Sequence, residues 1–317
     1  TTEIYTLSLH DALPISINLF KNDKGIEIYG QGFKAIFSRE SGQLSQYSVD
    51  GIDLIKSPAE AHFWRAPTDN DLGNGMPERT ALWKYAGSRM KTKILYGSLK
   101  NNTAEILIIN LDSLSSTTLT STYHVYGNGA IKVKQKIEIE DSLHSEMPRF
   151  GMKSDMPNDF KKVEWFGRGP HESYWDRKTS AAIGHYSGSV WDQSYRYVRP
   201  QETGNKTDIR WMALSNGKVG LMATGLPTFD GSVHQYPYSD LDHVPKSQKH
   251  GKLDIQPKDH VDWLIDYKQM GVGGDNSWGA KPHNHYLLNS DKYEYSFMLI
   301  PFEGGEDLNK LSKLKLD

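Results

Sequence analysis

The sequence predicts an all-β protein, a large antiparallel β-sandwich, on three observations. Several stretches alternate apolar and polar residues with the period of two that half-buried strands require. A Gly-Asn-Gly turn separates two of these stretches, as in a β-hairpin. The 317 residues include 28 glycines and 14 prolines, which suit many tight turns, and helical periodicity is scarce. At this length an all-β sandwich can still form a single domain.

The alternating stretches are the predicted strands. They cover residues 25–38, 104–113, 120–127 and 130–140. Gly127-Asn128-Gly129 predicts that the last two pair as a hairpin, because these residue types tolerate a positive φ. Two short helices are predicted over residues 78–87 and 306–315. After Ile17, no repeat, low-complexity tract or linker composition divides the chain.

Charge and composition exclude several classes of function. The 37 basic and 39 acidic residues nearly cancel, so no electrostatic footprint for nucleic acid or an anionic membrane is expected. No apolar run approaches the roughly 20 residues that span a bilayer. The absence of cysteine excludes disulfides and cysteine-ligated metals. It leaves the compartment, cytoplasmic or periplasmic, undetermined.

Residues 165–211 combine flat aromatic rings with charged groups. Trp165, Trp175, Trp191 and Trp211 alternate there with Arg168, Arg177, Arg210, Glu172 and Glu202. Sugars bind to such mixtures, because their C–H faces stack on aromatic rings and their hydroxyls take charged partners. Arg168, Glu172, Glu202 and Arg210 are therefore candidate substrate-binding residues. The alternative is that the tryptophans form the sandwich core and the charges form structural ion pairs.

Four sequence blocks carry a resemblance to a known family. They are HFWRAPTDNDLGNG (residues 62–75), WFGRGPHESYWDRK (165–178), YVRPQETGNKTDIRW (197–211) and MGVGGDNSWG (270–279). In this order they resemble the C-terminal small-chain domain, domain 5, of glycoside hydrolase family 2 beta-galactosidases. The chain departs from the family pattern at Ser173-Tyr174-Trp175, where Asn-Tyr-Pro is usual. The resemblance implies a galactose-mutarotase-like supersandwich over residues 17–317.

The resemblance also implies a function. The family's complete enzymes are retaining beta-galactosidases, which hydrolyse terminal non-reducing beta-D-galactosides and need two carboxyl groups about 5 Å apart. No pair in this chain matches the family's catalytic glutamates, so no catalytic residue is expected here. Those glutamates, with Mg²⁺ and a monovalent cation, are expected on an upstream barrel or a large subunit. The expected partners are that barrel and a beta-galactoside, and the formation of homo-oligomers is left open. The fragment alone is expected to be inactive and to hold no cofactor.

Trp278 is the leading candidate for sugar contact. Flanking glycines suit a tight loop that presents its indole from a rigid scaffold. The resemblance implies that this tryptophan reaches the barrel's active site and stacks on the sugar. Asp275 and Asn276 are expected to hold the loop through side-chain to backbone bonds. His283 and His285 are expected to lie near it, and His283 is a further candidate substrate-binding residue.

The first block offers oxygen ligands without the spacing of a calcium loop. Asp69, Asn70 and Asp71 are therefore expected to order the loop and contact the neighbouring domain, with Trp64 and Arg65 as anchors. The remaining histidines lack a helical i, i+4 pair, so no metal site is predicted. They are His234, His243, His250, His260, His283 and His285.

Two other functions are open to such a chain. An aldose-1-epimerase-like enzyme needs a histidine acid and a carboxylate base, which His171 with Glu172 or Glu202 would supply. Adjacent residues on a strand point to opposite faces, so His171 and Glu172 share a pocket only on an irregular turn. The third alternative is a stand-alone carbohydrate-binding domain without chemistry.

The first residues are set apart from the fold. Residues 1–15 match, codon by codon, a translation of a common short-read sequencing adapter, and the chain does not open with Met. Residues 1–16 are therefore expected to be non-native and are excluded from fold reasoning. Genomic sequence upstream of Ile17 distinguishes a truncated single-chain enzyme from the small subunit of a two-chain enzyme.

Overall fold

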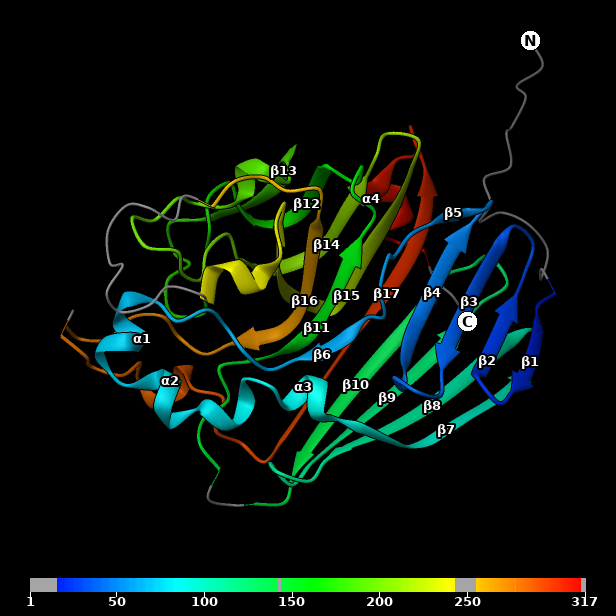
Figure 1. Cartoon of the computed structure of the whole chain (residues 1–317). Helices are drawn as coiled ribbons and strands as arrows, with labels where there is room; N and C mark the ends of the chain where they lie inside the picture. Colours follow the sequence, from blue (N-terminus) through cyan, green and yellow to red (C-terminus); the bar gives the residue numbers. More distant parts are fainter. Residues whose placement is uncertain (1–15, 142–143, 243–254, 277, 315–317) are drawn as a thin grey trace, which may run out of the picture.

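Two antiparallel sheets form the protein (Figure 1). The computed structural model describes residues 16–141, 144–242, 255–276 and 278–314. The smaller sheet takes its strands from the start of the chain in the order β1-β2-β3-β4-β5. Its strands are β1 (Asn18–Asn22), β2 (Gly25–Tyr29), β3 (Phe33–Ser38), β4 (Gln43–Val49) and β5 (Ile52–Asp53).

The larger sheet has 12 strands and supplies most of the protein. Its main path runs β13-β12-β14-β15-β17-β10-β9-β8-β7, and β16 pairs with β15 and β11, which in turn pairs with β6. The strands are β6 (Glu60–His62), β7 (Lys91–Lys100), β8 (Thr103–Asp112), β9 (Thr117–Val125), β10 (Ile131–Ile139), β11 (Arg149–Met156), β12 (Lys162–Gly169), β13 (Ala182–Ser189), β14 (Lys206–Ser215), β15 (Val219–His234), β16 (Val261–Gln269) and β17 (Lys292–Glu303).

The helices of the described residues are short and lie between strands. They are α1 (Asp69–Gly73), α2 (Met76–Arg79), α3 (Ala86–Arg89) and α4 (Leu308–Leu311), with 3₁₀ turns η1 (Ala81–Trp83), η2 (Trp191–Gln193), η3 (Tyr238–Asp242) and η5 (Asn284–Tyr286). In Figure 1, α1, α2 and α3 follow one another along one side of the molecule between β6 and β7. Within the part of the chain that is described, no helix has the length and apolar character to cross a membrane.

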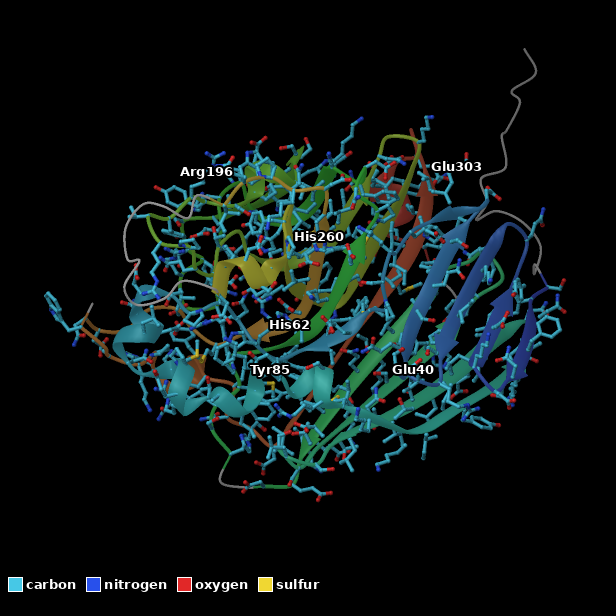
Figure 2. The ribbon with its side chains drawn as sticks, viewed as in Figure 1. Glu40, His62, Tyr85, Arg196, His260 and Glu303 are labelled. Carbon is cyan, nitrogen blue, oxygen red and sulfur yellow. The ribbon has the colours of Figure 1, made fainter. Side chains whose placement is uncertain are left out.

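The core lies between the smaller sheet and strands β7 to β10 (Figure 1). The ring centroids of Phe37 on β3 and Tyr123 on β9 are 4.9 Å apart. The Tyr47 hydroxyl on β4 donates to the Gly129 carbonyl at 2.6 Å, which joins the sheet to the β9–β10 turn. The same continuous core extends to β11 and β16, the part of the molecule that carries the labelled His62 and His260 (Figure 2).

The fold prediction is confirmed in class and in most elements. The three later predicted strands correspond to β8, β9 and β10, and the Gly-Asn-Gly turn joins β9 to β10, with Gly129 at a φ of 83°. The stretch 25–38 is two strands instead of one, because it turns at Gly30-Gln31-Gly32, where Gly32 has a φ of 76°.

The predicted helices are shorter than expected. Residues 78–87 do not form one helix, because the chain there passes from α2 through η1 to α3. The C-terminal helix, α4, is one turn long and is capped by Asp307, whose side chain accepts from the amides of Asn309 and Lys310. Lys315, residues 1–15, His243 and His250 lie outside the described residues.

Candidate functional site

The four sequence blocks meet in space, and α1 is where the first block joins the last. Thr68 and Asp71 form a capping box at the start of α1, each side chain accepting from the other's backbone amide. Buried Arg65 donates to Asp71 Oδ1 at 2.7 Å and Oδ2 at 3.0 Å. It also donates to the carbonyls of Met270 and Gly271, the latter at 2.9 Å. Arg65 therefore ties α1 to the start of the last block.

Asp176 ties the second block to the same place. Its Oδ1 accepts from the Val272 amide at 3.0 Å and its Oδ2 from the Gly273 amide at 2.8 Å. The side-chain amide of Asn70, through Nδ2, donates to the Val272 carbonyl at 3.2 Å. The backbone before Trp278 is thus held from both sides by charged or polar side chains.

The third block contributes Glu202, which lies in the buried charge network beneath this region. Its Oε2 accepts from Arg149 Nη2 at 2.8 Å and from the Tyr238 hydroxyl, and its Oε1 accepts from Gln269 Nε2 at 3.1 Å. Both Arg149 and Glu202 have fully buried side chains. Asp266 lies 3.6 Å from Arg149 Nε, and burial raises the pKa of Asp266 to about 8.

A cleft of about 170 Å³ opens where the blocks meet. Its lining comes from all four blocks, namely Thr68, Asp69, Asn70, Tyr174, Arg177, Tyr197, Gln201, Glu202 and Val272. This volume is below the roughly 300 Å³ at which small-molecule pockets usually begin. Two tyrosines, an arginine and several amide and carboxylate groups nevertheless suit the edge of a larger sugar site.

The Trp278 loop lies against the opposite end of α1. A Cβ on Gly279, whose φ is +115°, would come within 2.6 Å of the Gly73 carbonyl oxygen, so the two backbones are in close contact. Asn276 Oδ1 accepts from the Trp278 amide at 2.9 Å and from the Ala280 amide at 3.3 Å. The indole itself is 88% exposed. The backbone of the loop is therefore held by hydrogen bonds and close contacts, while the side chain of Trp278 is exposed to solvent.

The predicted loop-ordering residues have such contacts. Asp275 pairs with His283 Nε2 at 2.8 Å, which places His283 beside the Trp278 loop. Trp64 Nε1 donates to Asp242 Oδ2 at 2.9 Å and is otherwise buried. The backbone amide of Asp69 donates to Gln201 Oε1 at 3.1 Å.

Three predicted substrate-binding residues have structural partners and do not line the cleft. Arg168 Nε donates to Asp208 Oδ2 at 2.6 Å, and its Nη1 donates to two backbone carbonyls. Arg210 Nη1 donates to the Asp208 carbonyl at 2.7 Å. Glu172 accepts from Arg177 at 2.7 Å, from the Gly204 amide at 2.8 Å and from the Tyr197 hydroxyl. Glu172 thereby supports Arg177 and Tyr197, which do line the cleft.

The tryptophans of residues 165–211 do not form the expected sugar-binding surface. Trp165 and Trp211 are only 2% and 1% exposed, because β12 and β14 direct them into the core. Trp175 and Trp191 are half-buried, and each carries a cation above its ring, Lys268 at 4.2 Å and Arg196 at 4.7 Å. The core alternative was correct for the first two.

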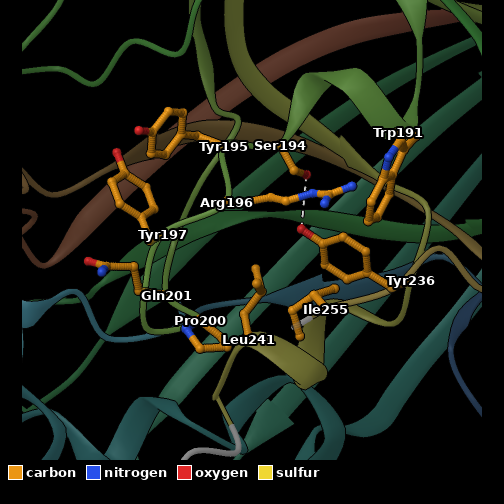
Figure 3. A pocket seen from close by; sticks show the side chains of 10 residues that line it. All are labelled: Trp191, Ser194, Tyr195, Arg196, Tyr197, Pro200, Gln201, Tyr236, Leu241 and Ile255. Carbon is orange, nitrogen blue, oxygen red and sulfur yellow. Dashed lines mark hydrogen bonds between the residues drawn. The ribbon is translucent and has the colours of Figure 1, made fainter. Parts of the chain in front are cut away.

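A second cavity adjoins the cleft and shares Tyr197 and Gln201 with it (Figure 3). Arg196 lies over Trp191 at its rim, and the Tyr236 hydroxyl donates to Ser194 Oγ at 2.9 Å (Figure 3). Its volume of about 30 Å³ matches roughly one water molecule. It is too small to hold a sugar.

Several residues of the site were not singled out from the sequence. Asp176, Arg149, Tyr238 and Gln269 all hold it together, yet only Asp176 lies within one of the four blocks. For Asp176, the only sequence signal was its position between Trp175 and Arg177 in the second block. The other three lie on β11, η3 and β16, which carry no polar motif.

Comparison with known proteins gives the family. The family model for the beta galactosidase small chain matches residues 29–299. Beta-galactosidase of Priestia megaterium is 36% identical over 302 residues, which cover 92% of this chain and 28% of that enzyme. Beta-galactosidase of Streptococcus thermophilus is 30% identical, over 93% of this chain and 29% of the enzyme. The chain thus spans under a third of these relatives' length.

Two solved structures are similar to the chain at low sequence identity. A TPR-domain-containing protein from Parabacteroides distasonis has a TM-score of 0.54 and 9% identity, over 92% of this chain and 49% of its own. Galactose 1-epimerase from Lactobacillus acidophilus has a TM-score of 0.46 and 10% identity, over 92% of this chain and all of its own. With its four blocks in one place and the family model matched along most of its length, the chain belongs to the beta-galactosidase small-chain family.

Proposed function

We propose that the chain is the C-terminal portion of a retaining family 2 beta-galactosidase and completes its active site with Trp278. The catalytic glutamates, Mg²⁺ and the monovalent cation would belong to a barrel upstream in the same polypeptide or on a large subunit. The exposure of Trp278 carries the proposal. All eight tryptophans are in the described residues, and the other seven are buried or half-buried.

An exposed and braced indole is suited to contact with a partner. A large apolar ring in water gives up the stabilisation of burial, about 25 cal/mol per Å². Its loop is nevertheless held by Asn276, by Gly73 and, through residues 272 and 273, by Asp176. A loop whose backbone is already held loses little conformational entropy when sugar or protein packs on its tryptophan.

In the complete enzyme, the chemistry follows the retaining mechanism. A glutamate nucleophile forms a galactosyl-enzyme, and a second glutamate protonates the leaving oxygen and later activates water. Trp278 would stack on the galactosyl ring or the aglycone, a contribution of about 1 kcal/mol beyond area burial. The isolated chain would not hydrolyse galactosides.

The epimerase alternative receives less support from the geometry. Glu202 is buried, and both its oxygens accept hydrogen bonds from Arg149, Tyr238 or Gln269, which leaves it poorly suited to take a sugar's proton. Among the hydrogen bonds of the described residues, none joins Glu202 to a histidine. His171 pairs with Ser180 at 3.1 Å instead of sharing a pocket with Glu172.

A chimera tests the proposal. Residues 17–317 would replace the matching segment of the Priestia megaterium beta-galactosidase, and size-exclusion chromatography would confirm that the chimera is folded. The chimera is expected to hydrolyse a nitrophenyl galactoside, whereas residues 17–317 alone are not. Trp278→Ala is expected to lower kcat/KM of the chimera at least about fivefold, from the stacking energy above.

The matched control is Tyr85→Ala, which removes another exposed aromatic ring, 61% exposed and beside α3 (Figure 2). Equal activity of the Trp278→Ala and Tyr85→Ala chimeras would contradict the proposed platform. Galactose binding by the isolated chain, abolished in Trp278→Ala or Arg168→Ala, would favour a carbohydrate-binding domain. Mutarotation accelerated by the isolated chain and abolished in Glu202→Gln, measured by polarimetry, would favour an epimerase.

A further inference from the structure

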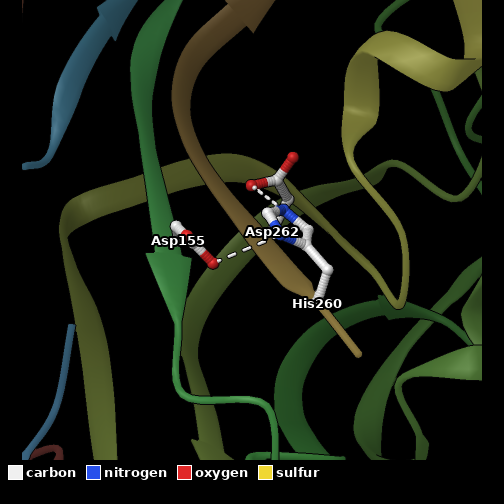
Figure 4. Close-up of side chains that lie close together, drawn as sticks. All are labelled: Asp155, His260 and Asp262. Atoms are coloured by element: carbon white, nitrogen blue, oxygen red, sulfur yellow. Dashed lines mark ion pairs between the residues drawn. The ribbon is translucent and has the colours of Figure 1, made fainter. Parts of the chain in front are cut away.

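Three potential metal ligands meet where β11 ends and β16 begins (Figure 4). Asp155 lies on β11, Asp262 on β16, and His260 immediately before β16. One ligand atom from each lies within 4.8 Å of the other two. The imidazole of His260 is between the carboxylates, with Nε2 3.0 Å from Asp262 Oδ1 and Nδ1 3.5 Å from Asp155 Oδ1.

The register of the two strands makes this arrangement unfavourable without a cation. Asp155 and Asp262 are direct cross-strand partners, and like charges directly opposite each other destabilise a sheet. Asp262 is only 1% exposed, so water does not screen its charge effectively. The contact with Asp262 raises the pKa of His260, so either a protonated imidazole or a bound metal ion supplies the positive charge between the two carboxylates, and zinc binding distinguishes them.

The ligand atoms lack hydrogen bonds that would account for their positions. Asp155 Oδ1, His260 Nε2 and Asp262 Oδ1 are all buried and have no hydrogen-bond partner among the described residues, although two of them are 3.0 Å apart. Two atoms that each lie about 2.0–2.2 Å from one ion are separated by about 3–3.5 Å, as His260 Nε2 and Asp262 Oδ1 are, whereas Asp155 faces the other ring nitrogen and would shift to reach the same ion.

The surroundings orient the cluster, and among the described residues no lysine or arginine forms an ion pair with it. Asp262 Oδ2 accepts from the Tyr238 amide at 2.7 Å, which turns Oδ1 towards His260. Of the nearby lysines, Lys153 pairs with Glu60 at 2.9 Å, and Lys56 donates to Asn158 at 3.1 Å.

We propose that Asp155, His260 and Asp262 bind one divalent transition-metal ion, with Zn²⁺ the best match. Zinc accepts imidazole nitrogen and carboxylate oxygen together, and three protein ligands leave a fourth position for water. Calcium and magnesium prefer oxygen ligands alone. The proposed site differs from the expectation that the histidines form no metal cluster, and it does not depend on the proposed galactosidase function.

The ion would act on the fold next to the cleft. Through Asp262 it would hold the Tyr238 amide at the start of η3. The hydroxyl of Tyr238 donates to Glu202, which lines the cleft. Zinc binding is therefore expected to raise the thermal stability of the chain.

The test is a zinc titration of the purified chain, stripped of metal and carrying no histidine tag. Competition with a chromophoric chelator would give affinity and stoichiometry. The unmodified chain is expected to bind one more equivalent of Zn²⁺ than His260→Ala, and its unfolding temperature should rise with Zn²⁺ only when His260 is present. Asp155→Asn and Asp262→Asn should each weaken binding at least about tenfold, and Asp155→Asn serves if Asp262→Asn does not fold, which circular dichroism would show.

The matched control is His283→Ala, because His283 pairs with only one carboxylate, that of Asp275 at 2.8 Å. This variant should bind zinc as the unmodified chain does. No zinc uptake by the unmodified chain, or the same stoichiometry and affinity in His260→Ala, would overturn the site. Loss of the ion in His283→Ala with retention in His260→Ala would assign it to the Trp278 loop instead, and would also overturn the proposal.

Discussion

Replacing Glu202 by glutamine tests whether this residue is a structural ion-pair partner. Its carboxylate accepts from Arg149 at 2.8 Å, from Gln269 at 3.1 Å and from the Tyr238 hydroxyl, and both charged side chains are fully buried. A glutamine has one acceptor oxygen, so its NH₂ group must face at least one of these donors. The substitution therefore removes a charge and creates a donor–donor contact.

The size of the effect follows from burial. Removing one partner of a buried ion pair costs about 3–5 kcal/mol. Glutamine keeps one acceptor, and loss of the Glu202 charge removes one cause of the raised pKa of Asp266, which can then ionise 3.6 Å from Arg149 Nε. We therefore expect the lower end, about 3 kcal/mol. Urea denaturation at neutral pH, followed by tryptophan fluorescence, measures the change in the free energy of unfolding.

The control is Glu294→Gln, which removes an exposed carboxylate paired with Lys134 at 3.0 Å. Exposed pairs contribute at most about 1 kcal/mol. If Glu202→Gln destabilised the chain no more than Glu294→Gln, the carboxylate would not be locked in the network. Glu202 would then be available to act as a catalytic base.

Three further substitutions have measurable outcomes. Burial raises the pKa of Asp230 to about 7, so the folded chain holds a proton that the unfolded chain releases above about pH 4. The stability of the folded chain therefore falls as pH rises between about 4 and 7. Asp230→Asn should make the slope of unfolding free energy against pH less negative by up to about 1.4 kcal/mol per pH unit. Urea titrations across that pH window measure the slope, and an unchanged slope would contradict the raised pKa. Asp176→Ala leaves the amides of residues 272 and 273 without their acceptor, so both should exchange hydrogen faster by mass spectrometry, and unchanged protection would show that the carboxylate does not brace the loop. Gly279→Ala places a Cβ 2.6 Å from the Gly73 oxygen, so the chimera should lose kcat/KM while the free energy of unfolding of the chain changes less than in Glu202→Gln, and full activity would mean that the loop position is unimportant.

Local patterns were enough to predict much of the fold. Strands β8, β9 and β10 follow from alternation, because side chains on a strand point to opposite faces in turn. The Gly-Asn-Gly turn followed from the backbone freedom of its residues. The helix over residues 78–87 was wrong because its apolar residues pack as separate short turns, with Trp83 and Ala86 buried.

The candidate site was predicted only in part. Trp278, Asp275 and Asn276 were singled out from the motif and its glycines. Asn276 makes the expected side-chain to backbone bonds, whereas Asp275 pairs with the side chain of His283. Substrate binding by Arg168 and Arg210 stays a prediction, and in the structure both donate to Asp208 or to backbone carbonyls. A motif identifies which charges are present and not which partner each one finds.

The sequence by itself therefore determined the all-β class, the hairpin and the four family blocks, since each depends on residues close together in the chain. Only the tertiary structure decided that those blocks share one cleft, that Trp165 and Trp211 are core, and that Asp155 faces Asp262 across two strands. These contacts join residues that can be a hundred or more positions apart. Strand register and sheet order set such contacts, and no local periodicity encodes them.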